Sequence, residues 1–258
     1  MNGRRRLRAL VTGAGSGIGL GLGRHLGALG HEVWLSDVTW ANVEPVAAEL
    51  SRQGLAAHAV ELDVTSATSI AAAVESLGEA GVDLLVNNAG LQHVDALEDF
   101  PVERWTLLVA VMLTGPAMVT RAVLPGMRRR NFGRIVNVGS IHSLVASPYK
   151  SAYVAAKHGL TGLTRTLALE TADVDVTVNT ICPSYVRTPL VDAQIAAQAR
   201  AHGIPEQRVI DEIMLRPMPK RAFIGVDELG ALVEYLASDA ARNVTGQSIA
   251  VDGGWTAQ

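Results

Sequence analysis

The sequence has a single cysteine, no long uninterrupted apolar run and no strong excess of either charge. Cys182 alone cannot form an intrachain disulfide, which excludes a disulfide-stabilised extracellular scaffold. No apolar run reaches the length of about 18 residues that a membrane-spanning helix needs. Lys and Arg number 22 against 25 Asp and Glu, so composition provides no general attraction to nucleic acid or to anionic lipid. We therefore expect no membrane partner and no nucleic-acid partner.

Apolar residues make up 48% of the 258 positions, which is enough for a substantial core. Short β-rich runs alternate with helical stretches along the chain. Strands are expected at 7–11, 32–36, 56–62, 82–86, 134–138, 174–181 and 248–251, and helices at 17–29, 42–53, 66–79, 102–130, 153–170 and 227–237. This alternation predicts an α/β fold class: a single Rossmann-type doubly wound parallel sheet with helices on both faces.

The segment boundaries indicate one domain over residues 1–258, because no linker or repeat interrupts the alternation. Residues 188–221 form an excursion too long for an ordinary connection, and we expect it to cover the substrate. Gly115-Pro116 predicts a bend in the long helix. The basic N-terminus has too short an apolar run for a signal peptide, which predicts a cytoplasmic protein.

A glycine-rich turn follows the first expected strand and reads Thr12-Gly13-Ala14-Gly15-Ser16-Gly17-Ile18-Gly19. The glycines allow a tight turn in which backbone N–H groups approach a pyrophosphate at the helix N-terminus. Asp37 closes the second strand, where a carboxylate can accept hydrogen bonds from ribose hydroxyls and repels a 2′-phosphate. Neither the turn nor Val38 provides a basic residue, so the sequence predicts NAD rather than NADP.

A second group of candidates consists of a serine, a tyrosine and a lysine. Tyr153 and Lys157 are four positions apart on an expected helix and therefore share one face. A nearby ammonium favours the phenolate form of a tyrosine and lowers its pKa toward the range of a useful base. Ser140 ends a strand, where its hydroxyl can polarise a carbonyl. A Tyr–Lys pair alone is usually a surface pair, and it becomes informative beside Ser140 and the glycine turn.

Taken together, these residues resemble the short-chain dehydrogenase/reductase family over nearly the whole chain. The motifs are Thr12-Gly13-x-x-x-Gly17-x-Gly19, Asn87-Asn88-Ala89-Gly90, Ser140, Tyr153-x-x-x-Lys157 and Pro183-x-x-x-x-Thr188. The resemblance implies that Tyr153 is the general acid/base, that Lys157 binds the nicotinamide ribose and lowers the Tyr153 pKa, and that Ser140 holds the substrate oxygen. It implies cofactor contacts from Gly13, Ser16, Gly17, Ile18, Gly19, Asp37, Asp63, Val64, Asn88, Ala89, Gly90, Tyr153, Lys157, Pro183, Val186 and Thr188. No metal is expected, because the histidines lack the spacing of metal ligands.

Within that family, the sequence most resembles members that oxidise D-3-hydroxybutyrate to acetoacetate with NAD. The closer similarity is carried by Gln92-His93, by residues 140–147 and 150–159, and by Val251-Asp252-Gly253-Gly254-Trp255. It implies a small 3-hydroxy acid as substrate, with its carboxylate held by Gln92, His142, Lys150 and Gln194, and it implies a homotetramer. Two alternatives stay open. One is a related dehydrogenase acting on a different small hydroxy acid or alcohol, and the other is a catalytically inactive NAD-binding scaffold.

Two positions depart from the family pattern. Met112 stands where relatives usually have an asparagine that supports a water chain to the lysine, and a thioether cannot donate a hydrogen bond. The water chain could be held by backbone groups or take another route, or it could be lost and turnover be slow. We expect activity to survive, because Ser140, Tyr153 and Lys157 are intact. Ser184-Tyr185 follows Pro183 where Gly-Trp is more usual, and Ser184 is expected to tighten a turn that prefers glycine.

Overall fold

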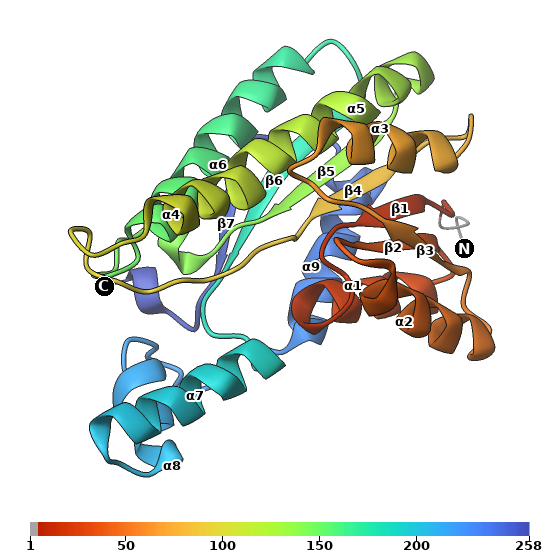
Figure 1. The fold of residues 1–258 in the computed structure, drawn as a ribbon. Helices are drawn as coiled ribbons and strands as arrows, with labels where there is room; N and C mark the ends of the chain where they lie inside the picture. The colour runs from red at the N-terminus through yellow and green to blue at the C-terminus, as the bar shows by residue number, and fades with distance from the viewer. Residues whose placement is uncertain (1–4, 258) are drawn as a thin grey trace.

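The computed structural model describes residues 5–257, so positions 1–4 and 258 of the expected domain lie outside the described residues. Within that range seven parallel strands form one sheet in the order β3-β2-β1-β4-β5-β6-β7 (Figure 1). The strands are β1 (Arg8–Val11), β2 (Glu32–Asp37), β3 (Ala57–Glu61), β4 (Leu84–Asn87), β5 (Gly133–Val138), β6 (Val176–Pro183) and β7 (Ser248–Val251). The predicted parallel sheet is confirmed.

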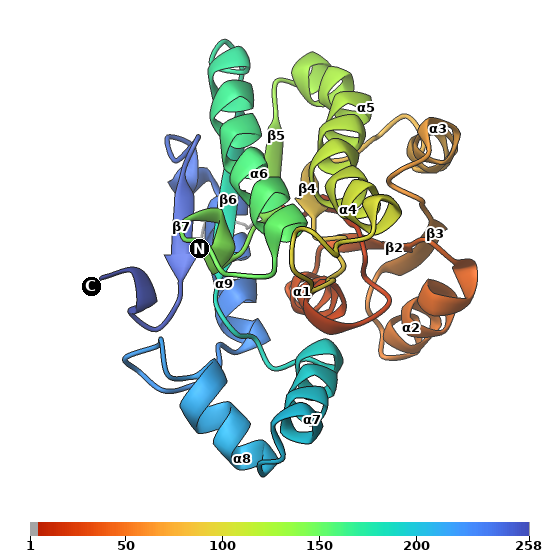
Figure 2. The same cartoon turned by 60° about the vertical axis from the view of Figure 1, so that its left-hand side comes forward.

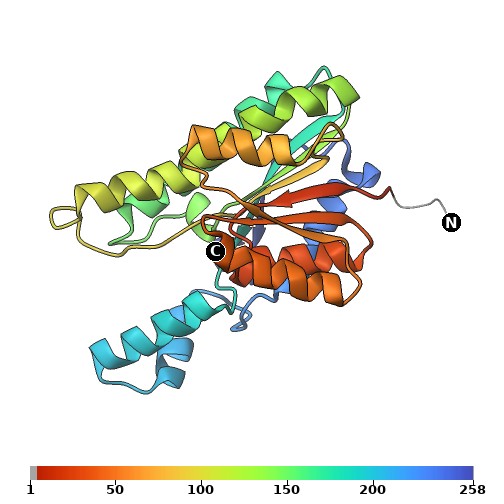
Figure 3. The same ribbon diagram turned by 45° about the vertical axis from the view of Figure 1, so that its right-hand side comes forward.

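Both faces of the sheet are covered by helices, as the nearly continuous apolar strands require. Ala9 and Val11 of β1 pack into one core cluster and Leu10 into the other, because successive side chains of a strand point to opposite faces. One face carries α1 (Gly17–Ala28), α2 (Trp40–Arg52) and α9 (Val226–Ala237), and the other carries α3 (Ala67–Ser76), α4 (Val102–Val109), α5 (Gly115–Arg130) and α6 (Ser151–Glu170) (Figure 3). The chain is therefore doubly wound, as predicted.

The long helical region is interrupted in the five residues just before the predicted bend. Ala110–Thr114 forms a π-helical turn between α4 and α5, and Pro116 lies in the first turn of α5. Proline has no N–H to donate, and a π-helical turn shifts the hydrogen-bond register at that point. By length and composition, Val102–Arg130 could cross a membrane, with a mean hydropathy of 1.8 in its most apolar window. Of that window, 44% is buried inside the protein, and one such helix by length and composition is weak evidence for a membrane span.

The expected excursion leaves the sheet beyond the carboxyl ends of the strands (Figures 1 and 2). It consists of α7 (Pro189–His202), the short α8 (Glu206–Arg208) and a π-helical turn, Val209–Met214. The Thr188 hydroxyl caps α7 by accepting a hydrogen bond from the Val191 N–H at 3.4 Å. That this excursion covers the substrate stays a prediction.

Candidate active site

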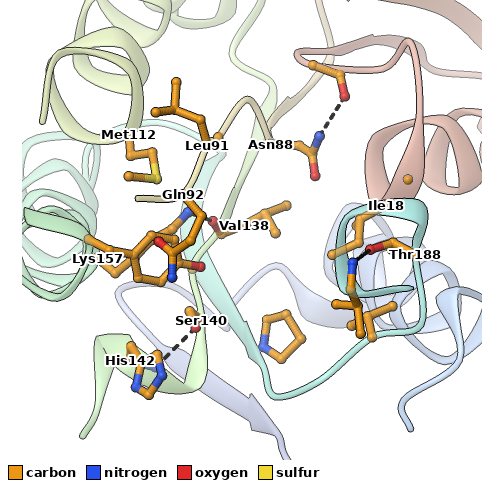
Figure 4. Close-up of a pocket in the computed structure, with 18 of the residues that line it drawn as sticks. Ile18, Asn88, Leu91, Gln92, Met112, Val138, Ser140, His142, Lys157 and Thr188 are labelled. Atoms are coloured by element: carbon orange, nitrogen blue, oxygen red, sulfur yellow. Dashed lines mark hydrogen bonds between the residues drawn. The ribbon is translucent and has the colours of Figure 1, made fainter. Parts of the chain in front are cut away.

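A cavity of about 320 Å³ lies where the carboxyl ends of the strands meet the excursion (Figure 4). Its position follows from the strand order, because β1 and β4 are neighbours and the chain leaves them in opposite directions. Ile18 and Thr188 lie on one side of this cavity, and Lys157, Met112 and His142 lie on the other.

The glycine-rich turn forms one wall and leaves the start of α1 open. Gly13 and Gly17 adopt φ values of +62° and +57°, which other residues rarely adopt. A Cβ on Gly19 would lie 2.4 Å from the Asn88 amide nitrogen, so this glycine allows close packing against β4. Ser16 precedes α1 without a capping bond from its side chain, and no acidic residue occupies the first turn of the helix. The N–H groups at this end are therefore available to an anion.

Hydrogen bonds join this turn to the end of β4. The Thr12 hydroxyl accepts from the N–H groups of Asn88 and Ala89, both at 3.0 Å. In return, the Asn88 amide donates to the carbonyl oxygens of Thr12 and Gly13, both at 2.9 Å. Asp37 lines the cavity from the end of β2. An open helix N-terminus beside a carboxylate fits the pyrophosphate and ribose of a nicotinamide dinucleotide.

The tyrosine and lysine of α6 enter the cavity beside β5. Lys157 is 4% exposed, and its Nζ donates to the Val138 carbonyl oxygen at 2.7 Å. Burial lowers the pKa of Lys157 to about 8. Burial also raises the pKa of Tyr153, and a hydrogen bond with Ser140 opposes that shift. Burial is the largest effect on the Tyr153 pKa, and Lys157 Nζ lies 5.7 Å from the ring centre. That Lys157 lowers the Tyr153 pKa stays a prediction.

Backbone contacts orient the hydroxyl of Ser140. Its Oγ accepts a hydrogen bond from the His142 N–H at 3.1 Å, and the Ser140 N–H donates to Ser143 Oγ at 3.2 Å. A serine hydroxyl has one proton to donate. With the backbone of His142 donating to this oxygen, that proton is free to face Tyr153 or a substrate oxygen.

Four side chains predicted to hold a carboxylate line the same cavity as Ser140 and Tyr153. They are Gln92 after β4, His142 and Lys150 between β5 and α6, and Gln194 on α7. Gln92 Oε1 is buried and meets no hydrogen-bond partner among the described residues. An amide oxygen in this condition takes a hydrogen bond from a water or from a donor group of a ligand, while the Gln92 Nε2 is the atom that can donate to a carboxylate.

His142 is neutral at pH 7. Burial and, next, the charge of Lys150 lower its pKa to about 4. Its Nδ1 lies 3.3 Å from the Val145 carbonyl oxygen, which can only accept, so Nδ1 carries the proton and Nε2 is an acceptor. Burial also lowers the pKa of Lys150.

Some predicted cofactor contacts do not line the cavity, namely Gly19, Asp63, Val64 and Ala89. Asp63 Oδ1 instead accepts from the N–H and the hydroxyl of Thr65, and Val64 is buried in the core. The other predicted residues do line it. Further residues that were not predicted as site residues also line the cavity. Ile141, Met112, Ser184 and Tyr185 belong to motifs or departures from the family pattern named above, whereas Leu91, Val138, Gly139, Pro189 and Val191 do not. Their one sequence signal, apart from Met112 in the π-helical turn, is a place at or just after the end of a strand or at the start of the excursion.

The two departures from the family pattern have different consequences. Met112 is 1% exposed and packs with Phe100, Leu108 and Ala152, so its thioether is a core side chain that also borders the cavity. Ser184 does not adopt a left-handed φ, so the expected need for glycine at this turn is wrong. The Tyr185 ring stacks on Trp255 with centroids 6.1 Å apart.

Among residues 5–257, no group of three or more His, Cys, Asp or Glu side chains is placed to hold a metal ion. The cavity instead combines an open helix N-terminus, a hydroxyl–phenol–ammonium cluster and one further half-buried cation, Lys150. That combination is suited to moving a proton and a hydride between an anionic alcohol and a dinucleotide.

Comparison with known proteins agrees with this chemistry. Residues 8–199 match the family model described as short chain dehydrogenase, and the chain belongs to that family of nicotinamide-dependent oxidoreductases. It is 51% identical over 198 residues to the D-beta-hydroxybutyrate dehydrogenase of Rhizobium meliloti, covering 76% of this chain and 77% of that one. It is 45% identical to the protein of the same name from Cupriavidus necator, covering 97% and 98%.

A solved structure shares the fold at a greater sequence distance. The crystal structure of an actinorhodin polyketide ketoreductase variant with NADPH superposes with a TM-score of 0.91 at 34% identity, covering 99% of each chain. A similar backbone therefore occurs in a ketoreductase solved with NADPH, so the fold does not distinguish NAD from NADP.

Proposed function

We propose that this protein oxidises D-3-hydroxybutyrate to acetoacetate, reversibly, with NAD as the cofactor. The observation that carries the proposal is the placement of Lys150, Gln92 and Gln194 in one cavity with Ser140 and Tyr153. His142 lines the same cavity, but its unprotonated Nε2 cannot donate a hydrogen bond to a carboxylate. A lysine and neutral amides can fix a carboxylate a few ångströms from a reacting carbon. The two relatives named D-beta-hydroxybutyrate dehydrogenase support the same substrate.

The mechanism begins with the acid held at its two ends. Lys150 attracts the carboxylate, and the Gln92 and Gln194 amides orient it. The substrate hydroxyl then meets Ser140, whose free O–H proton donates to the substrate oxygen. This places the same oxygen against the phenol of Tyr153.

Tyr153, as phenolate, takes the hydroxyl proton while the C3–H bond breaks and the C3–O bond becomes a carbonyl. NAD, when bound, supplies the acceptor for the hydride that leaves C3. Lys157, held by the Val138 carbonyl, places a positive charge beside the phenolate that must form. In the reverse direction the Tyr153 hydroxyl returns its proton to the oxygen of the keto acid.

The preference for NAD over NADP rests on Asp37. Its carboxylate can accept a ribose hydroxyl and repels a 2′-phosphate, and Val38 beside it carries no charge. The residues that would hold the dinucleotide are those of the glycine-rich turn, Asp37, Asn88 with Gly90, and residues 183–188 with Tyr153 and Lys157.

We also propose a cytoplasmic homotetramer. Large apolar side chains are exposed on the helices of one face, including Val102 (73%) on α4 and Leu169 (80%) on α6. Contacts between copies would cover such surface. Light scattering at micromolar concentration tests this, and a monomer contradicts it.

The alternative of a dehydrogenase for another small alcohol without a carboxylate lacks a reason for Lys150 in the cavity, whereas a dehydrogenase for a different small hydroxy acid would share Lys150 and is distinguished by the substrate test below. An inactive scaffold has no need of Ser140, Tyr153 and Lys157 together. The test is NADH formation from NAD with D-3-hydroxybutyrate, with the L enantiomer, 3-hydroxyvalerate and NADP in parallel. Turnover of the D acid with NAD supports the proposal. No turnover, with NAD binding shown by a thermal shift, refutes it.

A further inference from the structure

We propose that Asn42 is a positioning residue for cofactor selection, because its side-chain amide fixes the Asp37 carboxylate against the glycine-rich turn. The inference rests on the proposed function, in which Asp37 meets the ribose of NAD. It adds that Asp37 distinguishes NAD from NADP well only while the Asn42 amide holds its carboxylate in place.

The hydrogen bonds of the carboxylate carry the first step. Asn42 Nδ2 donates to Asp37 Oδ1 at 3.0 Å, and the Val38 N–H donates to the same oxygen at 2.9 Å. The Gly15 N–H donates to the other oxygen, Oδ2, at 3.2 Å. A carboxylate has about four acceptor positions. Three are therefore used by the protein, and the fourth, on Oδ2, stays available to a hydroxyl of the ribose.

Packing carries the second step. A Cβ on Gly15 would lie 2.9 Å from Asp37 Oδ2, 3.0 Å from the Asn42 carbonyl oxygen and 3.1 Å from Asn42 Cβ. The glycine turn, the carboxylate and the first turn of α2 are thus in close contact. Asp37 cannot move toward the turn, and the amide of Asn42 prevents it from rotating outward.

The N-terminus of α2, which carries Asn42, is fixed by a hydrogen bond from another element. Thr39 precedes the helix, but its side chain makes no capping hydrogen bond. The Trp40 N–H instead donates to Glu61 Oε2 from the end of β3, at 2.9 Å. This bond between elements fixes the helix end that carries Asn42, whose side chain turns back to Asp37 instead of capping its own helix.

The chemistry of the ligand follows from this arrangement. A 2′-hydroxyl can donate to the open position on Oδ2. A 2′-phosphate brings negative charge and oxygen acceptors to a carboxylate that has no freedom to turn away. Removing the Asn42 amide releases the carboxylate, so the hydroxyl loses a preorganised acceptor and the phosphate meets a side chain that can rotate into solvent.

The test measures dinucleotide binding directly, by fluorescence titration of purified protein with NADH and with NADPH. For Asn42→Ala we expect the Kd for NADH to rise about fivefold to tenfold, while the Kd for NADPH stays level or falls. The preference for NADH therefore shrinks by about the same factor. In the proposed reaction, KM for NAD should rise, while kcat and KM for the hydroxy acid change by less than about twofold.

Two further variants separate positioning from a general effect on α2. Asn42→Asp keeps the size of the side chain but replaces the donor with a second carboxylate, and it should weaken NADH binding at least as much as Asn42→Ala. Glu44→Gln alters an exposed polar residue of the same helix and should leave both Kd values unchanged.

The inference is overturned if Asn42→Ala binds NADH within about twofold of the wild-type protein, or if it weakens both dinucleotides equally. These results leave the proposed function standing. A wild-type protein that prefers NADH but does not oxidise D-3-hydroxybutyrate refutes the function, yet the variants still test Asn42. A wild-type preference for NADPH refutes both.

Discussion

Replacing Met112 with asparagine tests the most unusual position of the cavity. This substitution puts a hydrogen-bonding amide where the chain has a thioether. The side chain is 1% exposed and packs with Phe100, Leu108, Ala152 and Ala156 below the cavity. Its Sδ also lies 3.6 Å from the place that a Cβ on Gly90 would occupy. The new amide would therefore be enclosed largely by apolar groups.

The cost of this change can be estimated from that packing. Truncating a buried methionine to alanine costs about 2–5 kcal/mol, and leaving a buried amide unpaired costs about 1–3 kcal/mol. Asparagine keeps part of the volume, so we expect the free energy of unfolding to fall by about 2–4 kcal/mol. For a chain of this size, that corresponds to a fall in Tm of about 5–15 °C.

The rate should change far less than the stability. Ser140 and Tyr153 are untouched, and the Val138 carbonyl still holds Lys157 at 2.7 Å. We therefore expect kcat for D-3-hydroxybutyrate to change by less than about tenfold. Calorimetry and NADH absorbance on the same preparations measure both quantities.

A matched control lies on α5, in the same helical region. Met127 is fully buried but does not line the cavity. Met127→Asn should therefore lower Tm to a similar extent and leave kcat unchanged. A rise in kcat of about a hundredfold or more for Met112→Asn would refute the view that this chain works without an amide at position 112. An unchanged Tm would refute the packing argument.

Three further outcomes follow from the site. Lys150→Ala should raise KM for the acid by about tenfold or more while the Kd for NADH stays constant, and an unchanged KM removes Lys150 from the carboxylate site. Tyr153→Phe should lower kcat by about a thousandfold without weakening NADH binding. The wild-type oxidation rate should rise with pH, because burial raises the Tyr153 pKa and the phenolate is the base. A rate that does not change with pH, together with an active Phe variant, contradicts Tyr153 as the general base. The pKa of His142 is about 4 in the folded protein against an ordinary value of 6.5, so between these values only the unfolded chain gains the proton and the free energy of unfolding falls as pH drops. Between pH 7 and pH 4.5, the free energy of unfolding measured in urea should fall less for His142→Asn than for the wild-type protein. An equal fall in both proteins shows that His142 is not the cause of the pH dependence.

The sequence was sufficient to predict the sheet because each strand contains β-branched or other apolar residues and is followed by a turn or helix signal. The last strand, Ser248–Val251, matches the prediction at both ends. The interruption of the long helix was expected at Gly115-Pro116 and lies at Ala110–Thr114. The effect of a missing proline N–H falls on the preceding turn, and the way neighbouring carbonyls adjust depends on tertiary packing.

The site residues could be predicted where the reaction requires a particular functional group. They could not be predicted where any apolar side chain of suitable size can line the cavity. Ser140 and Lys157 belong to motifs, whereas Leu91 and Ile141 line the cavity as ordinary apolar residues. The direction of the Tyr153 pKa shift also escaped prediction. It depends on how far burial, which raises the pKa, outweighs the hydrogen bond with Ser140, which lowers it, and that balance requires coordinates.

The junction between β1 and β4 has a consequence for recombination between related genes. The residues proposed to select the cofactor end at Asn42 in the sequence. The residues proposed to hold the acid begin at Gln92. A crossover placed after β3 would therefore exchange the cofactor preference of two such enzymes and leave their substrate preference with the recipient. The hydrogen bonds between Thr12 and Asn88 span that crossover, so productive recombinants would be those whose parents agree at these two positions.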